Sequence, residues 1–451
     1  MGPAKHEEEV ICVANQRIPN VCRIAGAACC GAIRGRQLGA KDLLTPTSFH
    51  KENMHMEESK MQTKETFMAH PEITDQEVKN ALNHAIEQVE RQVPEFYDEF
   101  PAAASKDNFY PKIENVDWTN GFWTGEIWLA YEETKDEKLK EAALHQVSNF
   151  KNRIEKKIAV EHHDMGFLYS LSCVAAYKLT GSEEAKEAAL LAADNLMSRF
   201  QEKGQFFQAW GKLGALDNYR LIIDCLMNMP LLFWASEVTG DEKYKEKALA
   251  HIRTCMKVVV REDGSTFHTY FFDPETGAPV RGVTAQGNRN GSIWARGQSW
   301  GVYGCAMAYK YCKDPVYVDY FREVADVFMK HLPSDLVPYW DFDFEEGSDE
   351  PRDASSAAIV ACGMLEMAKY LDKEEAAYYT SCARRLLKAL TDHCLYKDEK
   401  ESNGILLHCT YARSTPTNTC NNNGVDECCT WGDYFYMEAL VRLCAEWETY
   451  W

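Results

Sequence analysis

Apolar residues recur at intervals of three and four along most of the chain, from about Thr74 to Trp451. This spacing places apolar side chains on one face of a helix, so it predicts a domain built almost entirely of α-helices. A single stretch, from Thr266 to Phe272, has the composition and alternation of a β-strand. The pattern therefore predicts an all-α fold.

The predicted helices are of two kinds. Charged, amphipathic segments, which we expect on the outside, cover residues 74–93, 136–154, 182–200, 241–260, 315–332 and 373–395. Each is followed by a much more apolar segment that we expect inside, and these inner segments start near residues 117, 164, 219, 294, 353 and 431. Polar and aromatic residues mark the start of every inner segment.

Six outer and inner pairs in succession predict an (α/α)6 barrel, a toroid of six hairpins. Every inner helix would then direct its N-terminus, with its free backbone N–H groups, toward one face. The alternative is an open solenoid, in which the same pairs stack without closing. The uneven repeat lengths and the long aromatic loops favour closure, so the functional residues should meet at one mouth.

Composition excludes several classes of partner. The 451 residues are 45% hydrophobic and 26% charged, which suits a globular protein with a large core. The formal net charge of −20 argues against nucleic acid or an anionic membrane as a partner. An acidic substrate would therefore need a local cationic patch.

The N-terminal part of the chain differs from the rest. Residues 1–66 lack a helical period and carry clusters of both charges, so we expect a disordered or loosely attached extension before a catalytic domain at 67–451. The apolar run 24–33 is too short for a membrane span and does not favour a signal peptide. The 17 cysteines, an odd number in mostly apolar surroundings, indicate reduced thiols and a cytoplasmic location.

Two aspartates are the candidate catalytic pair. Asp224 follows Leu221, Ile222 and Ile223, and an apolar setting favours the protonated form of a carboxyl group. Asp164 follows His162 and His163, which favour the ionised form. Asp164 could instead be a helix N-cap, whereas an unpaired carboxyl inside an apolar helix has no such structural explanation. Such a pair can carry out acid/base chemistry.

Tryptophans cluster at the starts of the inner segments. Indole rings beside amides and carboxylates suit the apolar faces and hydroxyl edges of sugars, although each tryptophan could equally fill the helical core. The seven are Trp118, Trp123, Trp210, Trp294, Trp300, Trp340 and Trp431.

Other polar residues have two interpretations each. Arg296 is a candidate for binding a substrate carboxylate, and a salt bridge inside the barrel is the alternative. For the histidines 162, 163 and 268 we favour hydrogen-bonding roles, because no third metal ligand stands at a recognisable spacing. The loop with His408, Cys409, Cys420, Cys428 and Cys429 could bind zinc or be a plain surface loop.

Motifs of several other enzyme classes are absent from the sequence. It has no Gly-x-Ser-x-Gly elbow, no P-loop and no glycine-rich dinucleotide fingerprint after a strand. The candidate site therefore consists of two carboxylates in an aromatic, amide-rich mouth. Such a site is typical of a glycosidase or a related sugar-processing enzyme.

From about Thr74 to Trp451 the sequence resembles the unsaturated glucuronyl hydrolases, glycoside hydrolase family 88. The segments that carry the resemblance occur in the family's order along the whole domain. They are Asp117–Gly125, His162–Ser170, Gln208–Gly211, Ile222–Cys225, His268–Thr269, Gln286–Asn288, Trp294–Gly301, Tyr339–Phe342 and Trp431–Tyr434.

The resemblance implies the (α/α)6 barrel and a hydration reaction. Family members act on the products of polysaccharide lyases, whose non-reducing end is a uronic acid with a double bond between C4 and C5. Asp224 would be the general acid/base and Asp164 the second carboxylate. The residues that would line the subsite for the unsaturated uronate are Trp118, His163, Trp210, His268, Gln286, Arg296 and Trp300.

We expect no metal and no organic cofactor. The loop 406–411 and the N-terminal extension differ from the family pattern, which leaves the second sugar open. The nearest alternative is an unsaturated rhamnogalacturonyl hydrolase acting on pectin fragments. A sugar 2-epimerase, which would use a pair of histidines, and a non-catalytic carbohydrate-binding barrel are further alternatives.

Overall fold

The computed structural model describes residues 62–451, and most of this region is helical. The charged amphipathic helices lie close to their predicted ranges. They are α2 (Asp75–Gln92), α4 (Glu137–Glu155), α7 (Glu183–Met197), α9 (Lys243–Val259), α11 (Val316–Lys330) and α13 (Lys373–His393). Local caps set their starts: Thr74 Oγ1 accepts the N–H of Glu77, and the Glu77 carboxylate accepts the N–H of Thr74 at the start of α2.

The inner segments are buried along almost their whole length. They are α3 (Asn120–Thr134), α5 (Met165–Tyr169) with η1 (Ser170–Val174) and α6 (Ala175–Thr180), η2 (Ile223–Asn228) with α8 (Met229–Thr239), α10 (Ala295–Cys312), α12 (Ala354–Ala368) and α14 (Thr430–Cys444). A helix that is apolar on all sides requires neighbours on all sides, so these segments form the interior of the domain.

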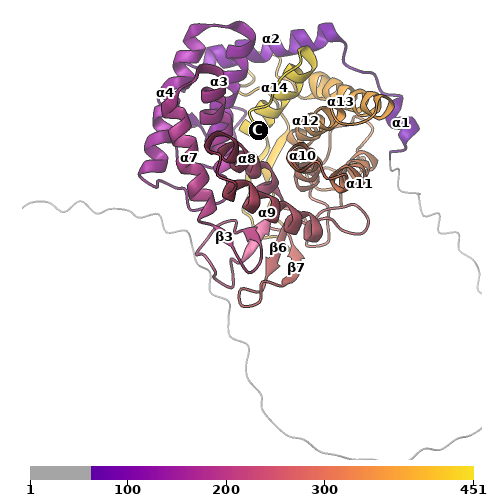
Figure 1. Ribbon diagram of the computed structural model, residues 1–451. Helices are drawn as coiled ribbons and strands as arrows, with labels where there is room; N and C mark the ends of the chain where they lie inside the picture. The colour runs from indigo at the N-terminus through magenta and orange to yellow at the C-terminus, as the bar shows by residue number, and fades with distance from the viewer. Residues whose placement is uncertain (1–61) are drawn as a thin grey trace, which may run out of the picture. The chain divides into compact units, whose positions relative to one another are not determined.

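The inner segments contact one another in a closed circuit. Helix α3 packs on α5 and η1, α5 on η2, η2 on α10, α10 on α12, α12 on α14, and α14 again on α3. Each outer helix packs on inner ones, for example α11 on α10 and α13 on α12. Figure 1 shows α8, α10, α12 and α14 near the middle of the domain, with α4, α7, α11 and α13 toward its periphery.

The prediction of a single strand is wrong. Strand β6 (Thr269–Phe272) lies within the predicted stretch, but it is the middle strand of an antiparallel sheet with β5 (Arg220–Ile222) and β7 (Pro279–Val283). Three further pairs are β1 (Phe100–Pro101) with β2 (Lys112–Ile113), β3 (Phe200–Gln201) with β4 (Phe206–Phe207), and β8 (Cys409–Ala412) with β9 (Asn423–Glu427). Such short strands do not show a period of two in the sequence.

The third inner segment also differs from its prediction. Instead of a helix from about residue 219, the chain forms β5, then the 3₁₀-helix η2, and only then α8. A continuous helix would place Pro230 in its interior, where proline removes a backbone hydrogen bond, and here Pro230 stands at the start of α8. Asp224 therefore lies in the first turn of η2 and not inside an α-helix.

Helix α1 (Lys64–Met68) crosses the predicted domain boundary at residue 67. Phe67 is buried, and the N–H of Gln62 donates to the Lys330 carbonyl at 3.0 Å, so residues 62–66 pack with the helical domain. The rest of the predicted extension, residues 1–61, lies outside the described residues. Within residues 62–451, no helix combines the length and the apolar character needed to cross a membrane.

Helix α5 approaches η2 very closely at Gly166. A Cβ atom on Gly166 would lie 2.4 Å from the Cα of Asn228, so glycine is the residue that this approach permits. The Asn228 Oδ1 accepts the N–H of Phe167 at 3.0 Å in a buried hydrogen bond that ties the two segments together. This contact holds the start of α5, with Asp164, next to Asp224 in η2.

Replacing Gly166 with alanine should therefore destabilise the domain. The added methyl group would overlap backbone atoms of η2, and we expect a loss of about 1–3 kcal/mol in the free energy of unfolding, measured by chemical denaturation. Gly291→Ala is the matched control, because the nearest atom to its Cβ is the far end of the long, 55% exposed Arg289 side chain, at 2.8 Å, and not backbone. Equal stability of the two variants would contradict the role of Gly166.

Candidate functional site

A pocket of about 620 Å³ opens where the inner segments begin. Part of its wall comes from residues just before or at the starts of α3, α5 and η2, as the sequence predicts for a common mouth, and the rest comes from the segments between β7 and α10 and between β8 and α14, with Trp210 and His268. The lining residues are Val116, Asp117, Trp118, Ala159, Glu161, His162, His163, Asp164, Trp210, Ile222, Asp224, His268, Ala285, Gln286, Tyr411, Thr419 and Cys420. The pocket is large enough for a small oligosaccharide.

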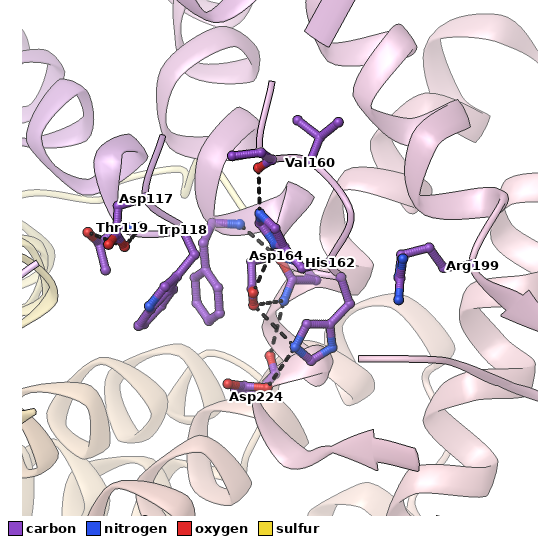
Figure 2. A network of polar contacts seen from close by, with 12 residues as sticks. Asp117, Trp118, Thr119, Val160, His162, Asp164, Arg199 and Asp224 are labelled. Carbon is purple, nitrogen blue, oxygen red and sulfur yellow. Dashed lines mark hydrogen bonds and ion pairs between the residues drawn. The ribbon is translucent and has the colours of Figure 1, made fainter. Parts of the chain in front are cut away.

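Asp164 stands at the N-cap position of α5, but its carboxylate does not cap the helix. The two carboxylate oxygens lie 3.1 Å from His162 Nδ1 and 3.3 Å from His163 Nε2. The amide of Asn228 is the third neighbour, with Nδ2 at 3.5 Å. The capping alternative therefore does not account for Asp164, whose carboxylate faces histidines and the pocket (Figure 2).

Asp224 faces Asp164 from the opposite side of the site (Figure 2). Its side chain is 18% exposed, and one carboxylate oxygen lies 3.4 Å from His163 Nε2. Strand β5 delivers this residue to the pocket, because Ile222 ends the strand and the backbone turns into η2 at the next residue. The neighbouring residues Ile223 and Cys225 are fully buried, so Asp224 is flanked by the apolar interior of the domain.

His163 lies between the two carboxyl groups. It is 1% exposed, and its Nε2 is within 3.4 Å of an oxygen of each aspartate. Its backbone N–H donates to the Ala209 carbonyl at 2.8 Å, which fixes the residue against the loop that carries Trp210. Burial lowers the pKa of His163 to about 4, although Asp164 acts in the opposite direction, so the ring is neutral near pH 7.

The two aspartates have opposite pKa shifts, in the directions that the sequence predicts. Burial raises the pKa of Asp224 well above its ordinary value, and the nearby charge of Asp164 raises it further, against a smaller effect of Arg296. Burial alone would raise the pKa of Asp164, but its contacts with His163 and His162 lower the pKa below its ordinary value. The site therefore pairs one carboxyl group whose setting favours the protonated form with one whose setting favours the ionised form.

Four other predicted residues line the pocket. Trp118 donates from Nε1 to the Tyr411 hydroxyl at 2.9 Å, and Gln286 Nε2 donates to the Tyr411 carbonyl at 3.1 Å. His268 Nδ1 accepts the N–H of Ala285 at 2.8 Å, and burial lowers its pKa to about 3. Trp210 lies at the rim, where 37% of the residue is exposed. An indole wall and an indole at the rim give the pocket two apolar faces for sugar rings.

Arg296 and Trp300 do not line the pocket. The Arg296 guanidinium donates to Asp353 at 2.6 Å and to the carbonyls of Thr410 and Tyr411, and the residue is only 2% exposed. This is the buried salt bridge that the sequence left open as the alternative. Trp300 is 1% exposed and packs against Phe167. Both residues support the site from behind its walls.

The remaining tryptophans of the predicted cluster belong to the core. Trp123, Trp294, Trp340 and Trp431 are each at most 5% exposed, and none of them lines the pocket. Of the seven, Trp118 and Trp210 are therefore the ones that can contact a ligand directly. Core packing was the stated alternative for each, and sequence position alone did not separate the two roles.

Sequence reasoning missed three residues that shape the site. Asn228 is fully buried and contacts both Asp164 and the start of α5, while Tyr411 and Asp353 hold Trp118, Gln286 and Arg296 in place. Asn228 had the same signal as Asp224, because it is a polar residue in an apolar run four positions later. Tyr411 reaches the site from the short strand β8, which no local pattern marks. Asp353 is the N-cap residue of α12, so the sequence marks its place at a helix start but not its contact with Arg296.

One group of side chains in the described region is arranged closely enough to hold a metal ion. The potential ligand atoms of His163, Asp164 and Asp224 lie within 4.8 Å of one another. The loop cysteines and His408 form no such group between residues 62 and 451, and His408 instead pairs with Asp426 at 2.7 Å. The zinc interpretation of that loop thus loses its geometric basis.

A second cavity, of about 660 Å³, lies on the outside of the domain between α1, α11 and α13. Arg322 and Glu375, two of the charged residues that line it, form an ion pair at 2.6 Å. Its lining does not include two carboxyl groups with opposite pKa shifts beside an indole ring, as the pocket around Asp224 does. The chemistry therefore points to the pocket around Asp224.

Comparison with known proteins agrees with this geometry. The family model described as Glycosyl Hydrolase Family 88 matches residues 88–443. The unsaturated chondroitin disaccharide hydrolase of Streptococcus pneumoniae is 45% identical over 394 residues, which are 87% of this chain and 98% of the relative. The unsaturated glucuronyl hydrolase of Bacillus sp. (strain GL1) is 40% identical over 376 residues, 83% of this chain and 98% of that protein.

Solved structures show the same similarity. The crystal structure of the unsaturated glucuronyl hydrolase from Streptococcus agalactiae matches with a TM-score of 0.83 and 44% identity, covering 87% of this chain and 98% of that chain. A variant of that enzyme complexed with dGlcA-GalNAc6S matches with a TM-score of 0.76 and 41% identity, covering 87% of this chain and 97% of the other.

Replacing Asp164 with asparagine should lower the pKa of Asp224. The negative charge of Asp164 raises that pKa, so its removal makes the ionised form of Asp224 less costly, while burial keeps the pKa above its ordinary value. Carbon-13 NMR of labelled aspartate carboxyl groups, followed over a pH titration, measures the change. Asp194→Asn, at an outer helix where the carboxylate accepts the Tyr244 hydroxyl at 2.7 Å, is the control. An unchanged pKa of Asp224 would refute the coupling.

Proposed function

Because this chain belongs to glycoside hydrolase family 88, we propose that it removes a 4,5-unsaturated glucuronic acid from the non-reducing end of lyase-generated disaccharides of the glycosaminoglycan type. Its relatives are named unsaturated chondroitin disaccharide hydrolase and unsaturated glucuronyl hydrolase. The observation in this chain that carries the proposal is the pair of carboxyl groups on either side of His163, with pKa shifts in opposite directions, in an aromatic pocket.

Asp224 is the proposed general acid/base. In its protonated form it gives its proton to C4 of the vinyl ether, and positive charge develops at C5 and the ring oxygen. The resulting Asp224 carboxylate then takes a proton from water as the water oxygen bonds to C5. The hemiketal opens to a ketone, and the rest of the sugar leaves. The raised pKa of Asp224 suits the first step, which needs a neutral acid near pH 7.

Asp164 is the proposed stabiliser of the positively charged transition state. An anion held in a buried site interacts strongly with developing charge, because little water screens it. His163, fixed between both aspartates, positions them relative to each other and to the sugar. Trp118, Trp210, His268 and Gln286 supply the apolar faces and polar groups that orient the unsaturated ring.

Arg296 and Trp300 have a different proposed role from the one expected of them. Arg296 lies behind the wall and fixes Tyr411, whose carbonyl also holds Gln286, and its charge partly offsets the negative site. Trp300 packs against Phe167 at the start of α5 and so supports Asp164. Neither residue is proposed to contact the sugar.

The proposed architecture is the (α/α)6 barrel. The closed circuit of contacts among six inner segments, each covered by an outer helix, supports closure over an open solenoid. A closed ring also explains why residues as distant in sequence as Trp118 and Cys420 line one pocket.

Two alternatives have less support. The pectin-directed unsaturated rhamnogalacturonyl hydrolase is not favoured, because the relatives are glucuronyl and chondroitin disaccharide hydrolases by name. An epimerase would use two histidines on opposite sides of a sugar. His268 is a hydrogen-bond acceptor from Ala285, and His408 pairs with Asp426 outside the pocket, so they do not form such a pair.

We also propose a cytoplasmic location. The 13 cysteines of residues 62–451 are all unpaired thiols, and most of them are buried. Reduced thiols on this scale are typical of a reducing compartment. Lyase products would then reach the enzyme by import, and cell fractionation with an antibody to the native protein tests the location.

Asp224→Asn should abolish turnover of the proposed substrate. The amide cannot donate a proton to carbon, and we expect the rate to fall by roughly 10²–10⁴-fold. Loss of the ultraviolet absorbance of the C4=C5 bond, followed on unsaturated chondroitin, heparin and pectin disaccharides, measures the reaction. Asp343→Asn is the control, because that carboxylate pairs with Arg289 at 2.7 Å away from the pocket lining. Full activity of Asp224→Asn would refute the mechanism.

Removal of metal ions should leave the rate unchanged. The proposed steps need a proton from Asp224 and the negative charge of Asp164, and both are supplied by the protein. The ultraviolet assay after dialysis against a chelator, compared with a mock-dialysed sample, checks this. A loss of activity that a divalent cation restores would contradict the expectation and direct attention to His163, Asp164 and Asp224.

A further inference from the structure

Two arginines and a phenylalanine form a row across the three-stranded sheet. In the antiparallel register, Arg220 of β5 stands opposite Phe271 of β6, and Phe271 stands opposite Arg281 of β7. Residues in register project from the same face of a sheet. The guanidinium carbons lie 5.3 Å (Arg220) and 4.9 Å (Arg281) from the centre of the Phe271 ring. We call Arg220, Phe271 and Arg281 the arginine row.

The arginine row lies beside the proposed catalytic pocket. The neighbouring register on the same face is formed by Ile222 and Thr269, and Ile222 lines the pocket. The row is thus two residues, or about 7 Å, further along the strands. Trp210 joins the two regions, because it lies at the pocket rim and its ring centre is 4.5 Å from the Arg220 guanidinium carbon. Figure 1 shows β6 and β7 at the edge of the domain.

The charges of the arginine row are not neutralised by the protein. In the part of the chain that the structure describes, neither arginine forms an ion pair. Arg220 is half-buried, its Nε has no hydrogen-bond partner, and Nη2 has one neutral acceptor, Asn218 Oδ1, at 3.3 Å. Arg281 is exposed. Asp217 is the acidic residue whose charge acts on Arg220, without reaching ion-pair distance.

This arrangement is unusual for a chain with a net charge of −20. Other guanidinium groups near the site have several acceptors. Arg289, Arg296 and Arg413 form ion pairs with carboxylates, and Arg153 and Arg199 each donate to at least two backbone carbonyls. A partly buried cation without a partner costs free energy unless a ligand completes it. The guanidinium carbons of the arginine row lie 4.5–5.3 Å from the flanking ring centres, and apart from Asn218 the described residues give these two groups no hydrogen-bond acceptor. Guanidinium N–H groups are the ones that bind carboxylates and sulfates.

We propose that the arginine row binds an anionic substituent, a sulfate or a carboxylate, on the sugars that follow the unsaturated uronate. This inference rests on the proposed function and names the substrate class more closely. The unsaturated ring occupies the pocket at Asp224, and the rest of the chain leaves past Trp210, where the row begins. The row supplies the local positive charge that an acidic protein needs to hold an acidic sugar.

The test compares the kcat/KM of anionic and neutral leaving groups. The substrates are an unsulfated unsaturated chondroitin disaccharide, its 4-sulfated and 6-sulfated forms, and an unsulfated unsaturated tetrasaccharide, whose additional charge is a second uronate carboxylate. For Arg281→Gln, the ratio of kcat/KM for at least one anionic substrate to that for the unsulfated disaccharide should fall about tenfold, through KM. Arg281→Lys should retain part of the ratio.

Two further variants complete the design. Arg220→Gln should lower the same ratio, which tests the second cation of the row. Arg253→Gln, an exposed position on the outer helix α9, removes one positive charge elsewhere and should leave the ratio unchanged. Thermal unfolding of each variant checks that the fold is intact, and Arg281 is exposed enough for its replacement to be tolerated.

The outcomes separate this inference from the proposed function. A fall in the ratio for the sulfated disaccharides identifies a sulfate, and a fall for the tetrasaccharide alone identifies a carboxylate. Normal turnover by the wild type with unchanged ratios in both Arg281→Gln and Arg220→Gln would overturn the role of the arginine row and leave the proposed function standing. No turnover of any substrate by the wild type would overturn both.

Discussion

The close contact between α5 and η2 is the constraint on which the site depends. Gly166 has no side chain, so the backbone of η2 can approach the start of α5, and the buried Asn228 amide then accepts the N–H of Phe167. This contact brings together Asp164, which precedes α5, and Asp224, which opens η2. Two carboxyl groups that are 60 positions apart in the chain thereby share one imidazole, that of His163.

Burial then turns this geometry into chemistry. Two like charges cannot both be stable at such a separation in a poorly hydrated site, so one carboxyl group retains its proton. The histidines and the Asn228 amide stabilise the anion at Asp164, and the apolar surroundings of Asp224 favour its neutral form. The same burial keeps His163 neutral, so it can contact both groups without a permanent charge. The surroundings of the two aspartates thus favour a proton donor at Asp224 and an anion at Asp164.

The outer helices and the direction of the pKa shifts could be predicted because both depend on neighbours in the sequence. The period of the apolar residues places α2, α4, α7, α9, α11 and α13 within a few residues of their observed bounds. The short strands and the 3₁₀-helix η2 were missed, since a few residues carry no detectable period and their hydrogen bonds are made with distant segments. The same limit applies to Tyr411, which reaches the site from the short strand β8.

The sequence by itself determined the helical class, the alternation of outer and inner segments, and the two unlike aspartates, because these follow from local spacing and composition. The tertiary structure alone decided which candidates face the pocket. Trp118 and Trp210 line it whereas Trp300 is buried, and Arg296 is paired with Asp353 while Arg220 has no charged partner. The physical reason is that the role of an aromatic or a charged side chain depends on what surrounds it in space. Packing between distant segments sets those surroundings.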